Sequence, residues 1–284
     1  MRTAIKFFAV AAVLVATAFA APAMAGPSPV PHSYTRAPAP HALPVIKPPM
    51  PFHPHPLIVQ PGTAKSFAVV SAGNWAGFAA HGTQFTSVSA TWSVPSLNCA
   101  ASPDGSQVGQ WVGLDGYGNN TVEQTGTAAG CSGGVPTYWA WYEMYPLAPV
   151  TLGDVGPGDA ITASVAYHPA LKEWRLILTD LTNGGRSTET LPCPSGSVCR
   201  NASAETISET PGAGPPAVSM PNYAQIAFDH NSLLDSGGVR GNYSTTAWLT
   251  DRINEVDLGN GDRMQTPSPL EGGQAFTIAA VASS

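Results

Sequence analysis

Apolar residues recur at every second position along most of the chain beyond residue 65. In the segment 88–94, Val88, Ala90, Trp92 and Val94 alternate with Ser and Thr, which is the period of a half-buried β-strand. Turn signals built from Gly with Pro, Asn or Asp separate such segments, and no long window carries the stripe of an amphipathic helix. Further strands are expected at 160–168, 173–181, 223–229, 244–250 and 274–282. This pattern predicts an all-β fold, an antiparallel β-sandwich or barrel.

The N-terminal residues are expected to lie outside this fold. Two basic residues precede an apolar run at 7–21, and the triplet at 23–25 fits a signal-peptidase site. The run is too short to span a bilayer comfortably. We therefore interpret residues 1–25 as a signal peptide, which predicts a secreted, extracellular protein.

Residues 26–65 differ again in composition. Twelve prolines lie between Pro27 and Pro61, with four histidines, three basic residues up to Lys65 and no acidic residue. Such a segment favours extended polyproline conformations and cannot build a core. It is interpreted as a linker or as a removable basic prosegment.

The body, residues 66–284, is acidic. It holds seven basic and all 18 acidic side chains, a formal net charge of −11. This balance argues against nucleic acid and anionic membranes as partners. The length suits one domain with a sizeable core, expected to be a monomer.

Four cysteines follow the expected signal peptide, and export makes disulfides the default state. Cys193 and Cys199 bracket a short segment with the Pro and Gly of a tight loop, which favours a bond between them. Cys99 and Cys131 then pair by elimination among the three possible connectivities. No cysteine pair has zinc-ligand spacing, and neither a metal nor another cofactor is expected.

One strand, 138–146 (YWAWYEMYP), carries an acidic residue among aromatic ones. Alternation places Trp139, Trp141, Glu143 and Tyr145 on one face. A core face would not normally carry Glu143, so the face suits a groove for an extended ligand. An aromatic core with Glu143 at its rim explains the pattern equally well.

Common catalytic motifs are weak or absent. The G-x-S-x-G match at 130–134 has no helix after it and contains Cys131. The histidines of the body, His81, His168 and His230, stand in no recognisable motif, and Asp235 lacks the second loop that a pepsin-like dyad needs. What remains is chemistry by Glu or Asp without His. The segment 204–211 (AETISETP) places Glu205, Ile207 and Glu209 on one strand face, although taken alone a solvated polar strand explains it better.

Taken together, these segments resemble the glutamic peptidases (eqolisins), acid endopeptidases, and in particular a secreted, bacterial-type member. The resemblance runs in order through most of residues 73–284. It is carried by GNWAGF (73–78), FTSVSATWSVP (85–95), WVGLDG (111–116) with QTG (124–126), the 138–146 strand and AETISE (204–209). The Trp-Tyr-Glu-x-Tyr-Pro strand and the Gln-Thr-Gly end are its most specific parts.

The resemblance implies a fold, a reaction and a set of site residues. The fold is two curved antiparallel sheets, concanavalin A-like or jelly-roll-like, with a groove across one of them. The substrate is a polypeptide, and Gln124 and Glu209 form the catalytic pair. The residues implied to line the cleft are Asn74, Trp75, Trp111, Asp115, Trp141, Glu143 and Tyr145.

The sequence departs from the family pattern at several positions. Glu123 stands where an apolar residue precedes the Gln, Met144 replaces a Trp, and Thr206 replaces an aromatic residue. Glu205 lies on the same strand face as Glu209, so a shift in the strand register would make Glu205 the catalytic residue in place of Glu209.

The implied chemistry is sound in elementary terms. Amide hydrolysis by water needs a base and a donor to the developing oxyanion. A Glu titrates in the acid range, whereas the Gln amide donates at every pH and adds no charge. Two rival interpretations remain: a secreted carbohydrate-binding sandwich, and a sandwich glycoside hydrolase that uses Glu143 and Glu209.

Overall fold

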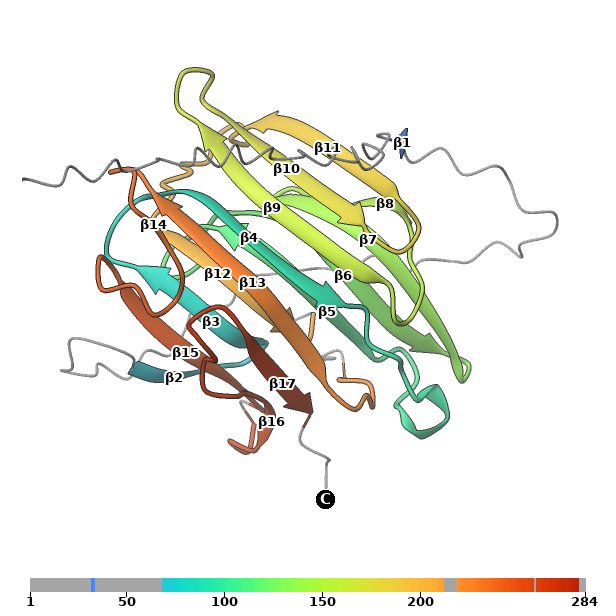
Figure 1. Ribbon diagram of the computed structural model, residues 1–284. Coiled ribbons are helices and arrows are strands. Elements are labelled where there is room, and N and C mark those ends of the chain that lie inside the picture. The colour runs from blue at the N-terminus through green and yellow to red at the C-terminus, as the bar shows by residue number, and fades with distance from the viewer. Residues whose placement is uncertain (1–31, 34–67, 212–218, 258, 281–284) are drawn as a thin grey trace, which may run out of the picture. The chain divides into compact units, whose positions relative to one another are not determined.

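The computed structural model describes residues 32–33, 68–211, 219–257 and 259–280, all of them within the unit Pro31–Ser284 (Figure 1). The expected signal peptide lies outside the described residues, as does the 26–65 segment apart from His32 and Ser33. Both assignments remain predictions.

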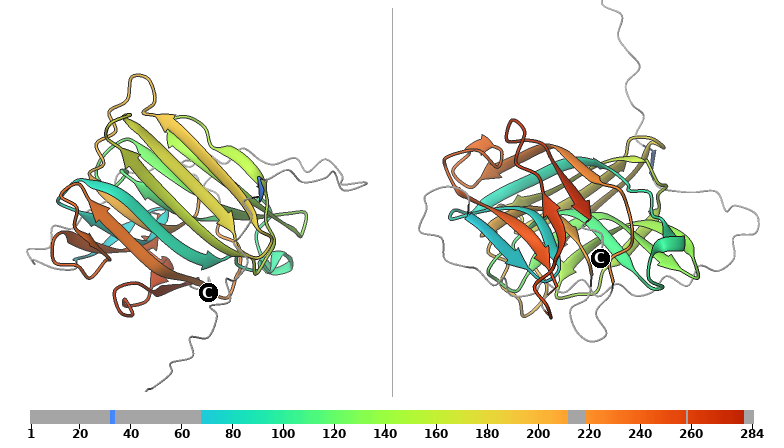
Figure 2. Two further views of the ribbon diagram at one scale, coloured as in Figure 1. Left: turned by 45° about the horizontal axis from the view of Figure 1, so that its top comes forward. Right: turned by 90° about the horizontal axis from the view of Figure 1, so that it is seen from below.

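The described chain is built from strands arranged in two layers (Figures 1 and 2). The first sheet runs in the order β2 (Ala68–Ala72), β15 (Leu249–Val256), β3 (Trp75–His81), β12 (Ser203–Glu209), β5 (Gln107–Leu114), β6 (Val122–Ser132), β7 (Val135–Tyr145) and β8 (Val150–Asp154). The second runs in the order β17 (Phe276–Ala280), β13 (Ile226–Asp235), β4 (Phe85–Ser93), β9 (Ala160–His168), β10 (Glu173–Asp180), β11 (Gly185–Pro192) and β1 (His32–Ser33).

Three short elements complete the described fold. Strand β16 (Arg263–Pro267) pairs with β15 of the first sheet and with β17 of the second, so it joins the layers along one edge. Strand β14 (Arg240–Gly241) pairs with β13, and η1 (Cys99–Ala101) is a single 3-10 turn. All pairings are antiparallel except β1–β11 and β2–β15. The all-β antiparallel sandwich is therefore confirmed.

The core lies between the two sheets, where their inward faces meet. Residues at alternate positions of β3, β5 and β7 supply the first sheet's side of it, including Phe78, Val112 and Met144. The other face of the first sheet carries a separate apolar cluster that contains Trp75, Trp111 and the tryptophans of β7. The predicted division of the 138–146 strand into two faces is thus confirmed.

Most expected strands are found, but three start late: β13 begins at Ile226 instead of 223, β17 begins at Phe276 instead of 274, and the third differs most. The strand expected at 244–250 begins only at Leu249. A turn precedes it, because the Asn242 N–H donates to Thr245 Oγ1 at 2.9 Å and the Ser244 N–H donates to Asn242 Oδ1 at 2.9 Å. Side chains of Asn, Ser and Thr that bond nearby backbone compete with strand pairing, so the apparent alternation was misleading there. Both predicted disulfides, Cys99–Cys131 and Cys193–Cys199, are confirmed.

Candidate active site

Gln124 and Glu143 lie directly opposite each other on neighbouring strands of the first sheet. They pair in the β6–β7 register, and the Gln124 Nε2 group donates to Glu143 Oε2 at 2.6 Å. Both side chains are 1 % exposed. Burial raises the pKa of Glu143 to about 9, although the Gln124 hydrogen bond acts in the other direction. Glu143 is therefore protonated over the acid and neutral range.

The two residues that follow Gln124 explain why its motif ends in Thr-Gly. The Thr125 hydroxyl donates to the Trp141 carbonyl at 2.8 Å, which ties β6 to β7. Gly126 lies opposite Trp111 in the β5–β6 register, and a Cβ there would come within 2.0 Å of the Gln110 carbonyl oxygen. Only glycine fits such a close backbone approach, so Gly126 lets Trp111 lie beside the Gln124 strand.

Glu209 ends β12 and is held by two side-chain donors. Asn74 Nδ2 donates to its Oε1 at 2.7 Å, and Trp111 Nε1 donates to its Oε2 at 2.8 Å. Burial raises the pKa of Glu209 well above its ordinary value, and the Trp111 hydrogen bond acts in the other direction; ionisation of the nearby Glu143 would raise the pKa of Glu209 further. The carboxyl group is thus oriented from two sides, and no cationic side chain among the described residues pairs with it.

The tryptophans build the walls of this face. Trp75 meets Trp111 edge-on, with ring centroids 4.9 Å apart and an interplanar angle of 76°. Trp141 faces Trp111 across Gly126, and both are almost fully buried. Tyr145 lies two residues beyond Glu143 on the same face of β7 and is half-buried. Asn74, Trp75, Trp111, Trp141 and Glu143 are therefore gathered around Gln124 and Glu209.

Glu205 shares the outward face with Glu209 but has different surroundings. It pairs with Gly113, which in turn pairs with Gln124, so Glu205 and Gln124 lie in one row across the sheet. It is fully buried, and neither carboxyl oxygen has a hydrogen-bond partner among the described residues. Burial raises its pKa well above the usual range. Glu205 therefore lacks the two donors that orient Glu209.

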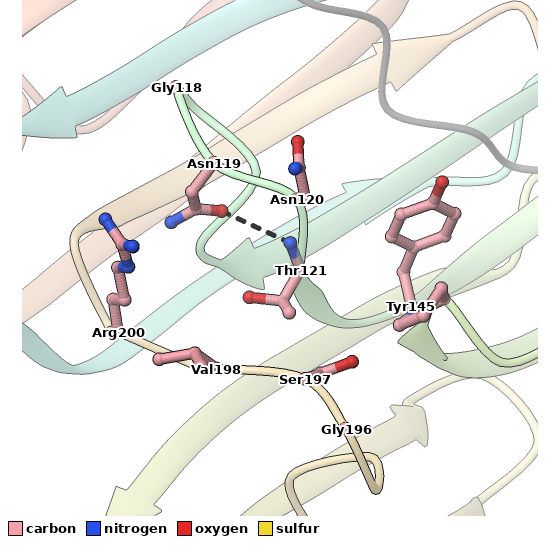
Figure 3. A pocket seen from close by; sticks show the side chains of 10 residues that line it. Gly118, Asn119, Asn120, Thr121, Tyr145, Gly196, Ser197, Val198 and Arg200 are labelled. Atoms are coloured by element: carbon pink, nitrogen blue, oxygen red, sulfur yellow. Dashed lines mark hydrogen bonds between the residues drawn. The ribbon is translucent and has the colours of Figure 1, made fainter.

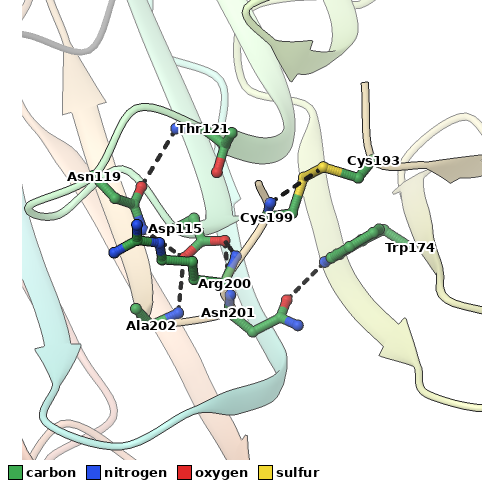
Figure 4. The surroundings of a disulfide bond; sticks show 9 residues. All are labelled: Asp115, Asn119, Thr121, Trp174, Cys193, Cys199, Arg200, Asn201 and Ala202. Atoms are coloured by element: carbon green, nitrogen blue, oxygen red, sulfur yellow. Dashed lines mark hydrogen bonds between the residues drawn. A yellow bond between two sulfur atoms is a disulfide. The ribbon is translucent and has the colours of Figure 1, made fainter. Parts of the chain in front are cut away.

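Asp115 occupies a different place from the other expected cleft residues. Its backbone has φ +68°, and its carboxylate accepts the N–H groups of Arg200, Asn201 and Ala202 at 2.6–2.7 Å (Figure 4). The Asn119 side-chain amide donates to it at 2.7 Å as well. The carboxylate thus fixes the loop that leads into β12, and it does not contact Gln124 or Glu209.

Sequence reasoning missed one acidic residue near the pair. Glu255 on β15 is fully buried, and its charge contributes to the raised pKa of Glu209. Its carboxylate accepts from Gln265 Nε2, and Gln265 Oε1 accepts from Ser208 Oγ at 2.7 Å. The alternation of 249–256 could have placed Glu255 on a strand, but no motif pointed to its burial.

Neither a metal centre nor a membrane span is found in the part of the chain that the structure describes. Within residues 68–211, 219–257 and 259–280, no group of three or more His, Cys, Asp or Glu could hold a metal ion. No helix in these ranges is long and apolar enough to cross a bilayer.

A curved sandwich with a Gln and a Glu among tryptophans on one outer face is the arrangement that the resemblance to glutamic peptidases implied. The chain matches the Peptidase A4 family over residues 73–279, and it belongs to that family. It is 36 % identical to scytalidopepsin B of Scytalidium lignicola over 143 residues, which cover 48 % of this chain and 51 % of that protein. It is 28 % identical to aspergillopepsin-2 of Aspergillus niger over 186 residues, 58 % of this chain and 65 % of that protein. The chain therefore spans less than two thirds of these curated relatives.

Solved structures agree with this assignment. A crystal structure of scytalido-glutamic peptidase with a peptide-based transition state analog superimposes with a TM-score of 0.62 and 25 % identity, covering 74 % of this chain and 98 % of the other. Aspergilloglutamic peptidase from Aspergillus niger gives a TM-score of 0.54 at 23 % identity, covering 62 % of this chain and 99 % of the other. The second likeness bears on the fold alone.

Proposed function

We propose that the protein is a secreted acid endopeptidase in which Glu209 activates water and Gln124 stabilises the oxyanion. The observation that carries the proposal is the position of Glu209. Asn74 and Trp111 donate to its two oxygens, and Gln124 lies on the same face of the first sheet. Family membership and the structural likeness to a peptidase that binds a peptide-based analog support a polypeptide substrate.

The reaction follows from these groups without a covalent intermediate. The ionised form of Glu209, which the Asn74 and Trp111 donors favour against the effect of burial, takes a proton from water while the water oxygen attacks the scissile carbonyl carbon. The carbonyl oxygen gains negative charge and is met by a Gln124 N–H group. Glu209 then returns the proton to the leaving nitrogen as the C–N bond breaks.

Glu143 has a supporting part in this scheme. Gln124 Nε2 donates to Glu143, and Gln124 Oε1 has no hydrogen-bond partner among the described residues. Turning the amide by about 180° would let the protonated Glu143 carboxyl donate to Oε1. The Nε2 group would then face the groove and the oxyanion.

The remaining expectations belong to the same proposal. Two disulfides in the body support an oxidising, extracellular location. The acid-free segment 26–65 would act as a prosegment that lies against the acidic body and loosens when its carboxylates become protonated. The protein would work as a monomer.

The decisive assay is digestion of a denatured protein at acid pH in the presence of a pepsin-type inhibitor. Inhibitor-resistant cleavage supports the proposal. Retention on sugar resins without any proteolysis would favour the carbohydrate-binding interpretation instead. For the prosegment, the precursor is incubated at acid and neutral pH and followed by gel and N-terminal sequencing. Unchanged length with full activity at both pH values would rule out a prosegment role.

A further inference from the structure

A pocket of about 600 Å³ adjoins the candidate active site beyond Tyr145 (Figure 3). One wall is the turn that leads into β6, and the opposite wall is the disulfide loop that precedes β12. The residues that line it are Gly118, Asn119, Asn120, Thr121, Tyr145, Pro146, Gly196, Ser197, Val198 and Arg200. Tyr145 belongs both to this lining and to the face of β7 that carries Glu143, so the pocket borders the candidate site.

Arg200 is the only charged residue of this lining. Its side chain is exposed and forms no ion pair with any residue in the part of the chain that the structure describes. The body, residues 66–284, carries a formal net charge of −11. A lone guanidinium in the lining of a pocket marks a position where a substrate carboxylate would be accepted.

The wall that carries Arg200 is fixed in advance. The Cys193–Cys199 disulfide closes the loop, and the Cys199 N–H points at Cys193 Sγ at 3.2 Å (Figure 4). Asp115 then binds the backbone N–H of Arg200 itself at 2.6 Å. On the opposite wall, Asn119 accepts the Gly116 N–H at 2.8 Å and donates to Asp115. Asp115 therefore ties the two walls together, and binding needs little reordering of either.

The distance from the reacting groups defines which substrate residue would reach the pocket. Tyr145 lies opposite Val122, two residues along from the Gln124–Glu143 pair. An extended chain advances about 3.3 Å per residue, so two to three residues separate the scissile bond from the pocket.

We propose that this pocket is a specificity subsite in which Arg200 binds a carboxylate of the peptide substrate, two to three residues from the cleaved bond. The inference rests on the proposed peptidase function. The carboxylate belongs to an Asp or Glu side chain or to the C-terminus of a short peptide. The preference fades as the substrate carboxylate becomes protonated below about pH 4.

The test measures cleavage of fluorescence-quenched peptides by the mature enzyme. The peptides differ at one position, and Glu, Gln or Lys is placed in turn at each of four positions on either side of the cleaved bond. The wild type is expected to cleave the Glu peptide about fivefold faster than the Gln peptide, in kcat/KM, at one position only. Arg200→Gln should equalise the two, and Arg200→Glu should favour Lys. Arg175→Gln, an exposed arginine on β10 in the other sheet, is the matched control and should keep the preference.

Two further arms separate the sources of the carboxylate and the possible failures. Peptides that end at the sensitive position, as free acid or as amide, show whether a C-terminal carboxylate serves as well as a side chain. Ser197→Trp should fill the pocket and slow only peptides long enough to reach it. The subsite proposal would be overturned if Arg200→Gln kept the preference for Glu, or if the wild type showed no such preference at any position. Either result would leave the proposed peptidase function standing. No cleavage of any peptide would overturn the proposed function and the subsite with it.

Discussion

Glu255 makes the stability of the fold depend on pH in a direction that can be measured. Its carboxyl group is fully buried, and burial raises its pKa to about 8, against the opposing effect of the Thr210 and Gln265 hydrogen bonds. The folded protein therefore holds a proton that the unfolded chain releases near its ordinary pKa. The stabilisation is complete below about pH 4.5 and is lost progressively as the pH rises towards 8.

The size of the effect follows from the shift. Between these pH values each unit costs about 1.4 kcal/mol, so Glu255 alone should remove about 3 kcal/mol from the free energy of unfolding between pH 4.5 and 6.5. Glu255→Gln removes the titrating group and still accepts from Gln265. The variant should match the wild type within about 1 kcal/mol at pH 4 and exceed it by about 3 kcal/mol at pH 6.5.

The assay is urea unfolding followed by tryptophan fluorescence at pH 4, 5 and 6.5, with all proteins in a Glu209→Gln background to prevent self-digestion. Glu271→Gln, an exposed acid, is the control and should follow the wild-type curve. If Glu255→Gln lost stability in parallel with the wild type across this range, ionisation of Glu255 would not be the cause and the reasoning would fail.

Three further predictions concern individual side chains. Gln124→Ala should reduce kcat by about 100–1000-fold, the usual cost of an oxyanion donor, with a smaller change in KM in steady-state peptide assays. Glu143→Gln should keep near wild-type kcat below about pH 8, because Glu143 is already protonated there. Glu143→Ala should lower kcat about tenfold. If the protein were a glycosidase that relies on an ionised Glu143, Glu143→Gln would instead abolish its activity. Asp115→Asn should lower the free energy of unfolding by about 2–4 kcal/mol in thermal or urea melts, since it weakens an acceptor shared by four N–H groups, and an unchanged melt would refute that structural role.

The fold was largely predictable because its strands show their period in the sequence. The strand 160–168 was placed correctly, and the two faces of 138–146 were assigned correctly because Trp and Tyr alternate around Glu143. Strands β5 and β6, around Trp111 and Gln124, are buried on both faces and carry no such alternation. They could be found only through their motifs.

The site was less predictable, because its geometry depends on contacts across the sheet. The sequence offered Glu205 and Glu209 as equals on one strand face. Two donors distinguish Glu209 from Glu205: Asn74, which precedes β3, and Trp111, which lies on β5. Asp115 appeared beside a catalytic motif, yet its carboxylate holds the loop at 200–202. The raised pKa values likewise come from burial, which no local pattern reveals.

Glu209, oriented by Asn74 and Trp111, is proposed to be the group that activates water. The most direct measurement is kcat/KM of a quenched peptide at acid pH for Glu209→Gln and Glu205→Gln, each confirmed to be folded by circular dichroism. Glu209→Gln is expected to lose nearly all activity, and Glu205→Gln is expected to retain most of it. An active Glu209→Gln beside a dead Glu205→Gln would contradict the account and shift the catalytic role by two residues along β12.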